Sequence, residues 1–202
     1  MNQKKALRGK PLFSLFEIYG IAVRAFCSMG DLMKSRKTGL VTEALQERIM
    51  LAVTAVNQCA MCSYAHAGMA LEAGLSEEEI RVFTEGDFPD LPEDEARAVL
   101  FGQHYADQRG RPSKEAWQAL TDYYGEGKAL GILAAARVIM LGNAVGIVLT
   151  SLRGRARKEG GVPRSCLLYE IGVLLFLIPA LPVALLHGLL ARLFGRRFLR
   201  FS

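Results

Sequence analysis

Apolar residues recur along most of the chain at spacings of three and four, which is the period of an amphipathic α-helix. Strict alternation of apolar and polar residues, the signal of a half-buried strand, is weak throughout. The pattern therefore predicts an all-α fold. The expected helices cover residues 11–35, 45–56, 59–74, 77–85, 93–108, 114–124 and 129–150.

Hydroxyl side chains and glycines mark the expected ends of these helices. Thr42, Ser76 and Ser113 each precede a helical run, where a hydroxyl can accept hydrogen bonds from the free N–H groups of the first turn. Gly74 suits a helix C-terminus, and residues 125–128 should separate two helices.

Residues 129–150 form a long apolar run, but Arg137 and Asn143 lie inside it and its alanines and glycines suit close helix packing. We expect a buried core helix here rather than a membrane span.

The last fifty residues differ from the rest. Residues 171–191 carry no formal charge, and that length can span a bilayer core. Both flanks are basic, which sets no orientation for a single pass, and Pro179 and Pro182 should kink a helix. A re-entrant hairpin or an interfacial anchor fits better, with a buried oligomerisation helix as the alternative. We thus expect a helical domain over 1–150, then a basic linker and an apolar helical extension over 151–202.

Charge is unevenly distributed in this chain of net charge +5. Basic blocks at 1–10, 153–164 and 192–200 border apolar runs, which favours contact with a membrane surface over nucleic acid. No nucleic-acid-binding motif accompanies them, so we expect no nucleic-acid partner.

Cysteine usage points to a reducing compartment. Four cysteines in 202 residues are too few for a disulfide scaffold, and Glu17 and Arg24 interrupt the N-terminal apolar run, unlike a signal peptide. We expect a cytoplasmic protein, associated with a membrane if residues 166–202 bind one.

The candidate chemistry lies in a C-x-x-C-x-x-x-H run made of Cys59, Cys62 and His66. Residues 57–58 look like a break, so Cys59 would open a helix whose N–H groups favour a thiolate. The three positions fall within about 60° of one helix face. His66 can take or return a thiol proton, and Glu47 on the preceding helix can orient it. The two cysteines can also close a disulfide.

Two other interpretations of this run compete with redox chemistry. A single zinc ion would need all three side chains close together, but positions 59 and 66 are about 10.5 Å apart along a helix axis, and no second cysteine pair follows. The other is a pair of structural cysteines with a core histidine. Redox chemistry is favoured, and we expect no metal and no cofactor.

The remaining cysteines and histidines suit structural roles. We expect Cys27 to be a small buried core residue and Cys166 a buried or interfacial thiol. His104 is expected at the surface or in the core, and His187 in a structural or interfacial position.

Glu47, eleven intervening residues, the motif from Cys59 to His66, and the exit Leu75-Ser-Glu-Glu-Glu-Ile80 together resemble the carboxymuconolactone decarboxylase and alkylhydroperoxidase D-like family. The resemblance is strong over residues 39–84 and looser to about 150. It implies an all-α fold, usually oligomeric, with a peroxide-reducing dithiol site. Cys62 would be the attacking thiol, Cys59 the resolving thiol, and His66 with Glu47 the proton relay.

Met61 departs from the family pattern, because characterised peroxidases of the family often carry a histidine there. The branch that decarboxylates a lactone generally lacks the cysteine pair, which argues against that reaction.

We therefore expect a thiol-dependent antioxidant peroxidase that reduces organic hydroperoxides and is reset by an external thiol, from a protein or a small molecule. A homo-oligomer is expected. The alternatives are a non-catalytic, membrane-associated redox-sensing or oligomeric module, and thiol–disulfide exchange with a protein partner.

Overall fold

The computed structural model describes residues 12–88, 90–199 and 201, so the basic block predicted at 1–10 lies outside the described residues. Within these ranges the chain forms seven helices and no strand, which confirms the all-α prediction. The helices are α2 (Leu15–Lys37), α3 (Glu43–Asn57), α4 (Ala60–Glu72), α5 (Glu77–Glu85), α6 (Glu93–Asp107), α7 (Lys114–Ala156) and α8 (Leu167–Leu193).

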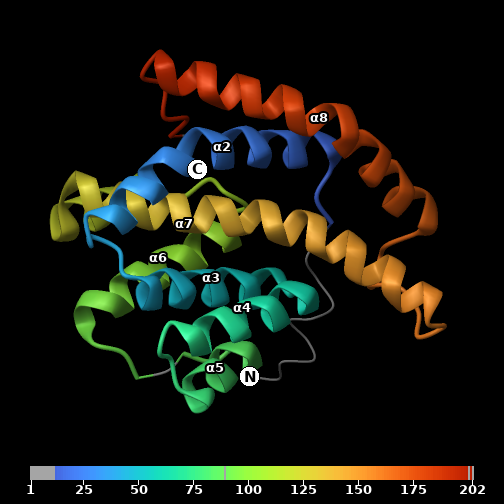
Figure 1. Ribbon diagram of the computed structural model, residues 1–202, viewed down its shortest axis with the longest axis horizontal. Helices are drawn as coiled ribbons and strands as arrows, with labels where there is room; N and C mark the ends of the chain where they lie inside the picture. The colour runs from blue at the N-terminus through green and yellow to red at the C-terminus, as the bar shows by residue number, and fades with distance from the viewer. Residues whose placement is uncertain (1–11, 89, 200, 202) are drawn as a thin grey trace.

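Helix α7 runs through the middle of the molecule (Figure 1). Helices α2 and α8 lie on one side of it, and α3 to α6 lie on the other. Most of the α7 window that is apolar enough to cross a membrane is buried inside the protein, including Arg137 and Asn143. The expected core helix is therefore present, and the site described below is built against it.

The predicted caps form as hydrogen bonds. The hydroxyls of Thr42, Ser76 and Ser113 each accept from a backbone N–H three residues later, at 3.1 Å. Each bond satisfies one of the N–H groups that a helix start leaves free. Helix α2 begins later than predicted, because Ser14 is its N-cap and exchanges hydrogen bonds with Glu17.

The break predicted at 125–128 is shorter than expected. Only Gly125 leaves the helical region, with φ 73° and ψ 160°, values that a residue with a side chain adopts at a cost. The helix resumes directly afterwards and continues to Ala156. The predicted runs 114–124 and 129–150 are thus two arms of α7 joined by a kink.

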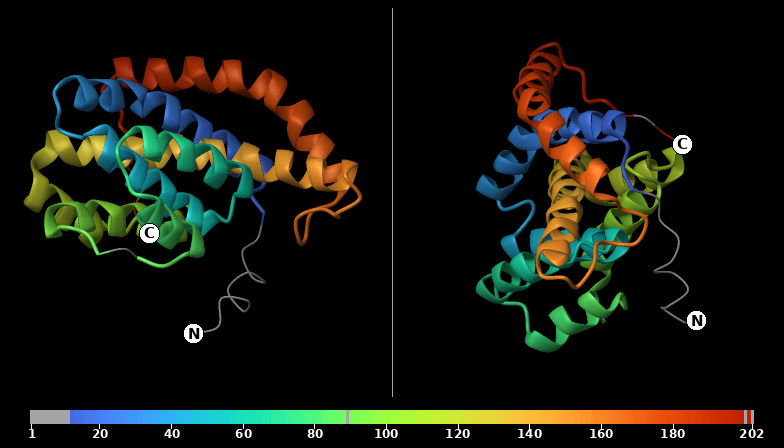
Figure 2. Two further views of the ribbon diagram at one scale, coloured as in Figure 1. Left: turned by 60° about the horizontal axis from the view of Figure 1, so that its bottom comes forward. Right: turned by 90° about the vertical axis from the view of Figure 1, so that its right-hand side faces the viewer.

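Helix α8 is one continuous curved helix lying along α2, so the re-entrant hairpin is not formed (Figure 2). Pro179 and Pro182 are accommodated inside it. Its buried stripe repeats every three or four residues and is narrow, made of Glu170, Val173, Leu177, Ala180, Ala184, Gly188 and Ala191. The stripe includes small residues because the helices approach closely: a Cβ at Gly188 would lie 2.9 Å from the backbone of α2.

The opposite face of α8 is exposed and apolar. Only 28% of its most apolar window is buried. Both α7 and α8 are long and apolar enough to cross a membrane, but α7 is the core helix, whereas α8 leaves most of its leucines exposed. The exposed residues are Leu167, Leu168, Ile171, Leu175, Ile178, Val183, Leu185, Leu186, Leu189, Leu190, Leu193 and Phe194.

A buried carboxylate fastens the start of α8 to the end of α7. Glu170 has no exposed surface and accepts hydrogen bonds from Ser151 and Ser165 at 2.6 Å and from Arg155 at 3.0 Å. Burial alone would raise the pKa of Glu170, but these hydrogen bonds and the Arg155 charge outweigh burial and hold it below its usual value.

We expect Glu170→Gln to lower the free energy of unfolding by about 2 kcal/mol at pH 7, because it removes the anion that these three donors surround. A carboxylate whose pKa is lower in the folded than in the unfolded protein stabilises the fold at pH values above the unfolded-state pKa. This stabilisation is lost as the pH falls through the folded-state pKa. The difference between wild type and variant, measured by chemical denaturation, should therefore shrink below about pH 4. Glu159→Gln, at an exposed position nearby, should change little at either pH.

Candidate functional site

The C-x-x-C motif lies where α3 ends and α4 begins. Gln58 adopts a left-handed conformation (φ 59°), which stops α3 and turns the chain. Cys59 is the N-cap of α4, and its sulfur accepts the backbone N–H of Cys62 at 3.3 Å. The prediction that a new helix opens at Cys59 is confirmed, with Cys59 just outside the helix.

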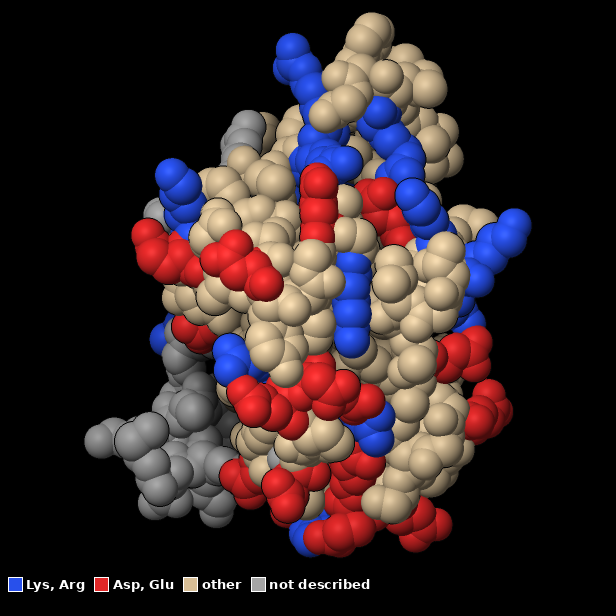
Figure 3. Space-filling view, turned by 90° about the vertical axis from the view of Figure 1, so that its left-hand side faces the viewer, with Lys and Arg blue, Asp and Glu red and all other residues tan. Residues whose placement is uncertain are grey.

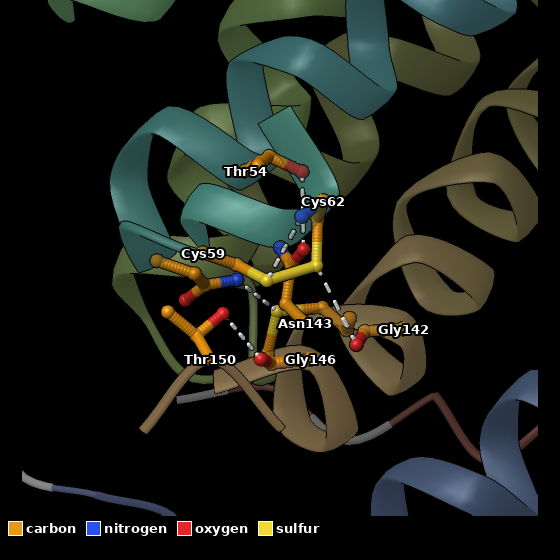
Figure 4. Close-up of a disulfide and its surroundings, with 9 residues drawn as sticks. Thr54, Cys59, Cys62, Gly142, Asn143, Gly146 and Thr150 are labelled. Carbon is orange, nitrogen blue, oxygen red and sulfur yellow. Dashed lines mark hydrogen bonds between the residues drawn. A yellow bond between two sulfur atoms is a disulfide. The ribbon is translucent and has the colours of Figure 1, made fainter. Parts of the chain in front are cut away.

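The two cysteines are joined as a disulfide with their Cα atoms 5.2 Å apart (Figure 4). Cys59 has no exposed surface, and Cys62 is 7% exposed. Burial protects the pair from solvent and leaves Cys62 as the more accessible of the two residues.

Helix α7 forms the floor beneath the sulfurs (Figure 4). A Cβ at Gly146 would lie 2.6 Å from the sulfurs of both Cys59 and Cys62, closer than atoms pack. The carbonyl oxygen of Gly142, one turn earlier, lies 3.6 Å from the Cys62 sulfur, where it can accept a hydrogen bond from the thiol when the pair is reduced.

Asn143 lies between these glycines and is fully buried. Its Oδ1 accepts a hydrogen bond from Thr54 on α3 at 3.1 Å. Within the described ranges its Nδ2 is buried without a hydrogen-bond partner. Figure 4 shows the Asn143 amide beside the disulfide, so an unused N–H donor lies close to atoms that carry negative charge as thiolates.

The sequence pattern assigned the two glycines to helix packing and treated Asn143 only as a polar residue that argues against a membrane span. The available signal was the spacing Gly142-Asn-x-x-Gly146, which puts two glycines on one face beside a buried amide. The sequence does not show which other helix packs against this face of α7, because that depends on the tertiary fold.

Glu47 and His66 form the predicted pair. The Nδ1 atom of His66 lies 2.7 Å from Oε2 of Glu47, with the carboxylate on α3 and the imidazole on α4. Glu47 is 5% exposed and the His66 side chain is 15% exposed. A neutral imidazole that donates from Nδ1 to Glu47 keeps Nε2 available as a proton acceptor.

His66 is not bonded to the cysteines in this oxidised form: among the described residues, no hydrogen bond links it to either sulfur. Cys59, Cys62 and His66 therefore lie in the same short segment, as predicted. The hydrogen bond of the His66 ring, however, is to the Glu47 carboxylate. No group of three or more residues within the described ranges could hold a metal ion.

The other cysteines and histidines lie apart from this motif. Cys27 is buried as predicted. Cys166 is exposed at the start of α8, so of its two predicted positions, buried or interfacial, the buried one is wrong. His104 accepts the Ser113 N–H at 3.0 Å and braces a turn. His187 contacts the Tyr19 hydroxyl at 3.2 Å between α8 and α2.

A cavity of about 410 Å³ adjoins the start of α4. Gln58 and Ala60, the neighbours of Cys59, line it, while neither cysteine does. The rest of its lining is mainly apolar, formed by Leu12, Phe13, Ala106, Ile147, Val162 and Pro163, with Asn57, Arg109 and Thr150 as polar groups.

Comparison with known proteins gives one match. Residues 22–100 match the model of the carboxymuconolactone decarboxylase family, whereas no curated protein and no solved structure matches the chain. The matched segment runs from α2 into α6 and contains Glu47, Cys59, Cys62 and His66. Residues 22–100, which carry the whole candidate motif, are therefore similar to the carboxymuconolactone decarboxylase family.

Proposed function

We propose that this protein is a thiol-dependent peroxidase that reduces organic hydroperoxides with the Cys59–Cys62 pair. The observation that carries the proposal is a bridged cysteine pair at a helix N-terminus, close in sequence to a histidine that a buried carboxylate orients. A pair that can close a disulfide within one turn can resolve an oxidised sulfur without a second protein.

The reaction begins from the reduced pair. The Cys62 thiolate attacks the terminal oxygen of R–O–O–H, so that an S–O bond forms as the O–O bond breaks. Cys62 becomes a sulfenic acid, and the alkoxide that leaves takes a proton to give R–OH. The Cys59 thiolate then attacks the Cys62 sulfur, the disulfide forms, and hydroxide leaves and is protonated to water.

An external thiol donor completes the cycle by supplying two electrons and two protons. It would attack Cys62, the more exposed residue, and release Cys59 as the leaving thiolate. The N–H groups at the start of α4 stabilise a thiolate at Cys59, which makes it both a good leaving group and a good resolving nucleophile.

His66 and Glu47 manage the protons in this proposal. His66 lies one turn beyond Cys62 and would take the thiol proton and deliver it to the departing alkoxide. Glu47 holds the imidazole by its Nδ1 atom and stabilises the imidazolium that forms in between. This relay needs no histidine at position 61.

The cavity beside α4 supports an organic substrate over hydrogen peroxide. Its volume of about 410 Å³ and mainly apolar lining suit an alkyl or aryl group, with the O–O bond directed towards the cysteines. Because the cavity is not lined by either sulfur, we assign it to the body of the substrate alone.

We expect Glu47→Gln to lower the rate at which hydroperoxide oxidises the reduced Cys59–Cys62 pair by about 10²-fold. The variant keeps the size of the side chain but removes the charge that orients and stabilises His66. Stopped-flow measurement of the reaction with cumene hydroperoxide across pH 5–9 checks this, and the variant should react more slowly than wild type throughout that range.

Glu43→Gln is the matched control for that measurement, since Glu43 is exposed one turn earlier on the same helix. If both variants react like wild type at every pH, Glu47 has no part in the relay.

The exposed face of α8 favours a second candidate, a membrane-associated or oligomeric module that uses the cysteine pair as a redox sensor. Such a module would be oxidised once and would not turn over with any thiol donor. Thiol–disulfide exchange with a protein partner would show turnover with an oxidised protein in place of a hydroperoxide.

A further inference from the structure

A second cavity, of about 200 Å³, lies away from the disulfide, between α2, α7 and the C-terminal end of α8. Its charged lining consists of four arginines and one carboxylate, namely Arg137, Arg192, Arg196, Arg197 and Asp31. So strong an excess of one sign in a small hollow indicates a site for an anion.

Arg137 is the innermost of these groups, at 4% exposure. Its guanidinium donates to the Ser28 hydroxyl at 2.8 Å and to the backbone carbonyls of Arg197 and Phe198 at 3.0 Å. Its Nε is buried without a partner, and no carboxylate in the described part of the chain forms an ion pair with it. A buried cation without a counter-ion is costly, and an anion in the adjoining cavity would remove that cost.

The other arginines are only partly neutralised. Arg192 pairs with Asp31 at 3.1 Å, and Arg197 pairs with Glu126. The Arg196 side chain is exposed and makes no hydrogen bond or ion pair within the described ranges. Two of the four guanidinium groups, Arg137 and Arg196, are therefore left without a carboxylate.

We propose that this arginine pocket binds a phosphate group. Planar guanidinium groups match the oxygens of a phosphate, and two positive charges without carboxylates suit its negative charge. The cavity is large enough for such a group and is walled by residues of α2, α7 and the end of α8 together with residues 195–197, which follow α8. This inference stands on the charges around Arg137 and is independent of the peroxidase proposal.

The surface around the pocket identifies the source of the phosphate as an anionic phospholipid. Leu193 and Phe194, next to the pocket, are 80% and 79% exposed, and they continue the apolar outer face of α8. Figure 3 shows the side of the molecule that lies on the left in Figure 1. On that side, Lys and Arg side chains gather towards the top, where α8 lies, and Asp and Glu lie mostly towards the bottom. An apolar helix face beside basic side chains is the arrangement that binds the surface of an anionic bilayer.

The test measures binding of the full chain to vesicles of phosphatidylglycerol and of phosphatidylcholine by co-sedimentation. We expect binding to phosphatidylglycerol only, weakened about fivefold in Arg196→Gln. Arg153→Gln is the control, because it removes one exposed positive charge from α7 outside the pocket lining and should bind like wild type.

Thermal unfolding with inorganic phosphate, against chloride at equal ionic strength, separates a lipid headgroup from free phosphate. In one outcome, phosphate stabilises the wild type but not Arg196→Gln, and the protein shows no preference for phosphatidylglycerol vesicles. That outcome would support a phosphate site and overturn its assignment to a lipid headgroup. The proposed phosphate site would be wrong if the protein bound both vesicle types equally and phosphate did not stabilise it. It would also be wrong if Arg196→Gln and Arg153→Gln weakened vesicle binding equally.

Discussion

Replacing Cys62 by serine is expected to lower the turnover of organic hydroperoxides by about 10³ or more, because the attacking sulfur is lost. The neighbouring Cys59 cannot take its place efficiently, since it is fully buried while Cys62 retains some exposure. The variant should still fold, because serine is close in size to cysteine and the Cys62 backbone N–H keeps its place in the first turn of α4.

Cys59→Ser should behave differently from Cys62→Ser. It should react once with hydroperoxide and then stop as a sulfenic acid, which a thiol-directed reagent can trap and mass spectrometry can place on Cys62. Cys166→Ser is the control, since it removes an exposed free thiol outside the motif. The opposite pattern, with turnover retained in Cys62→Ser and lost in Cys59→Ser, would reverse the two roles.

The second large effect is expected at Gly146. Alanine there would place a Cβ 2.6 Å from both sulfurs, so the oxidised protein should lose about 1–3 kcal/mol of stability despite the better helix propensity of alanine. Reduction should relieve part of this clash, because separate thiols can rotate away. The variant should therefore favour the reduced state, measured as a higher reduction potential in a glutathione redox titration.

Gly142→Ala is the matched control for Gly146→Ala. It lies one turn earlier on α7, and its Cβ would make only an ordinary contact, 3.6 Å from Ile139. This variant should gain up to about 1 kcal/mol of stability in either redox state. Equal changes in the two variants would mean that the disulfide does not pack on α7 as described.

The helices were predicted well from the sequence, because the interactions that start and stop a helix involve residues only a few positions apart. The hydroxyls of Thr42 and Ser113 cap the helices they precede, and both bonds span only three residues. The break at Gly125 was also predicted, but not that α7 continues beyond it to Ala156. Whether a kinked helix continues depends on what both arms pack against, and here that is the core of the molecule.

Helix α8 shows the same limit. Its prolines and basic flanks predicted a hairpin or an anchor, and the structure has a single helix whose narrow stripe of small residues fits α2. That fit depends on residues far apart in the sequence, such as Gly188 and the backbone around Cys27. Composition alone could not reveal it.

In the candidate site, the motif predicted the participants and missed their surroundings. Glu47 and His66 meet as expected, across nineteen positions of sequence and two helices. The α7 floor made by Gly142, Asn143 and Gly146 was not predicted, because it approaches the cysteines only through tertiary packing. Likewise, the sequence could not show that the buried Nδ2 of Asn143 has no hydrogen-bond partner among the described residues.

The most direct test of the peroxidase proposal is a free-thiol count on pre-reduced protein before and after one equivalent of cumene hydroperoxide, with Cys62→Ser measured alongside. The wild-type chain has four cysteines, and the count should fall rapidly until only Cys27 and Cys166 remain, while Cys62→Ser keeps all its thiols. If the wild type also retains all four thiols for hours, the pair does not react with hydroperoxides and the proposed function is wrong.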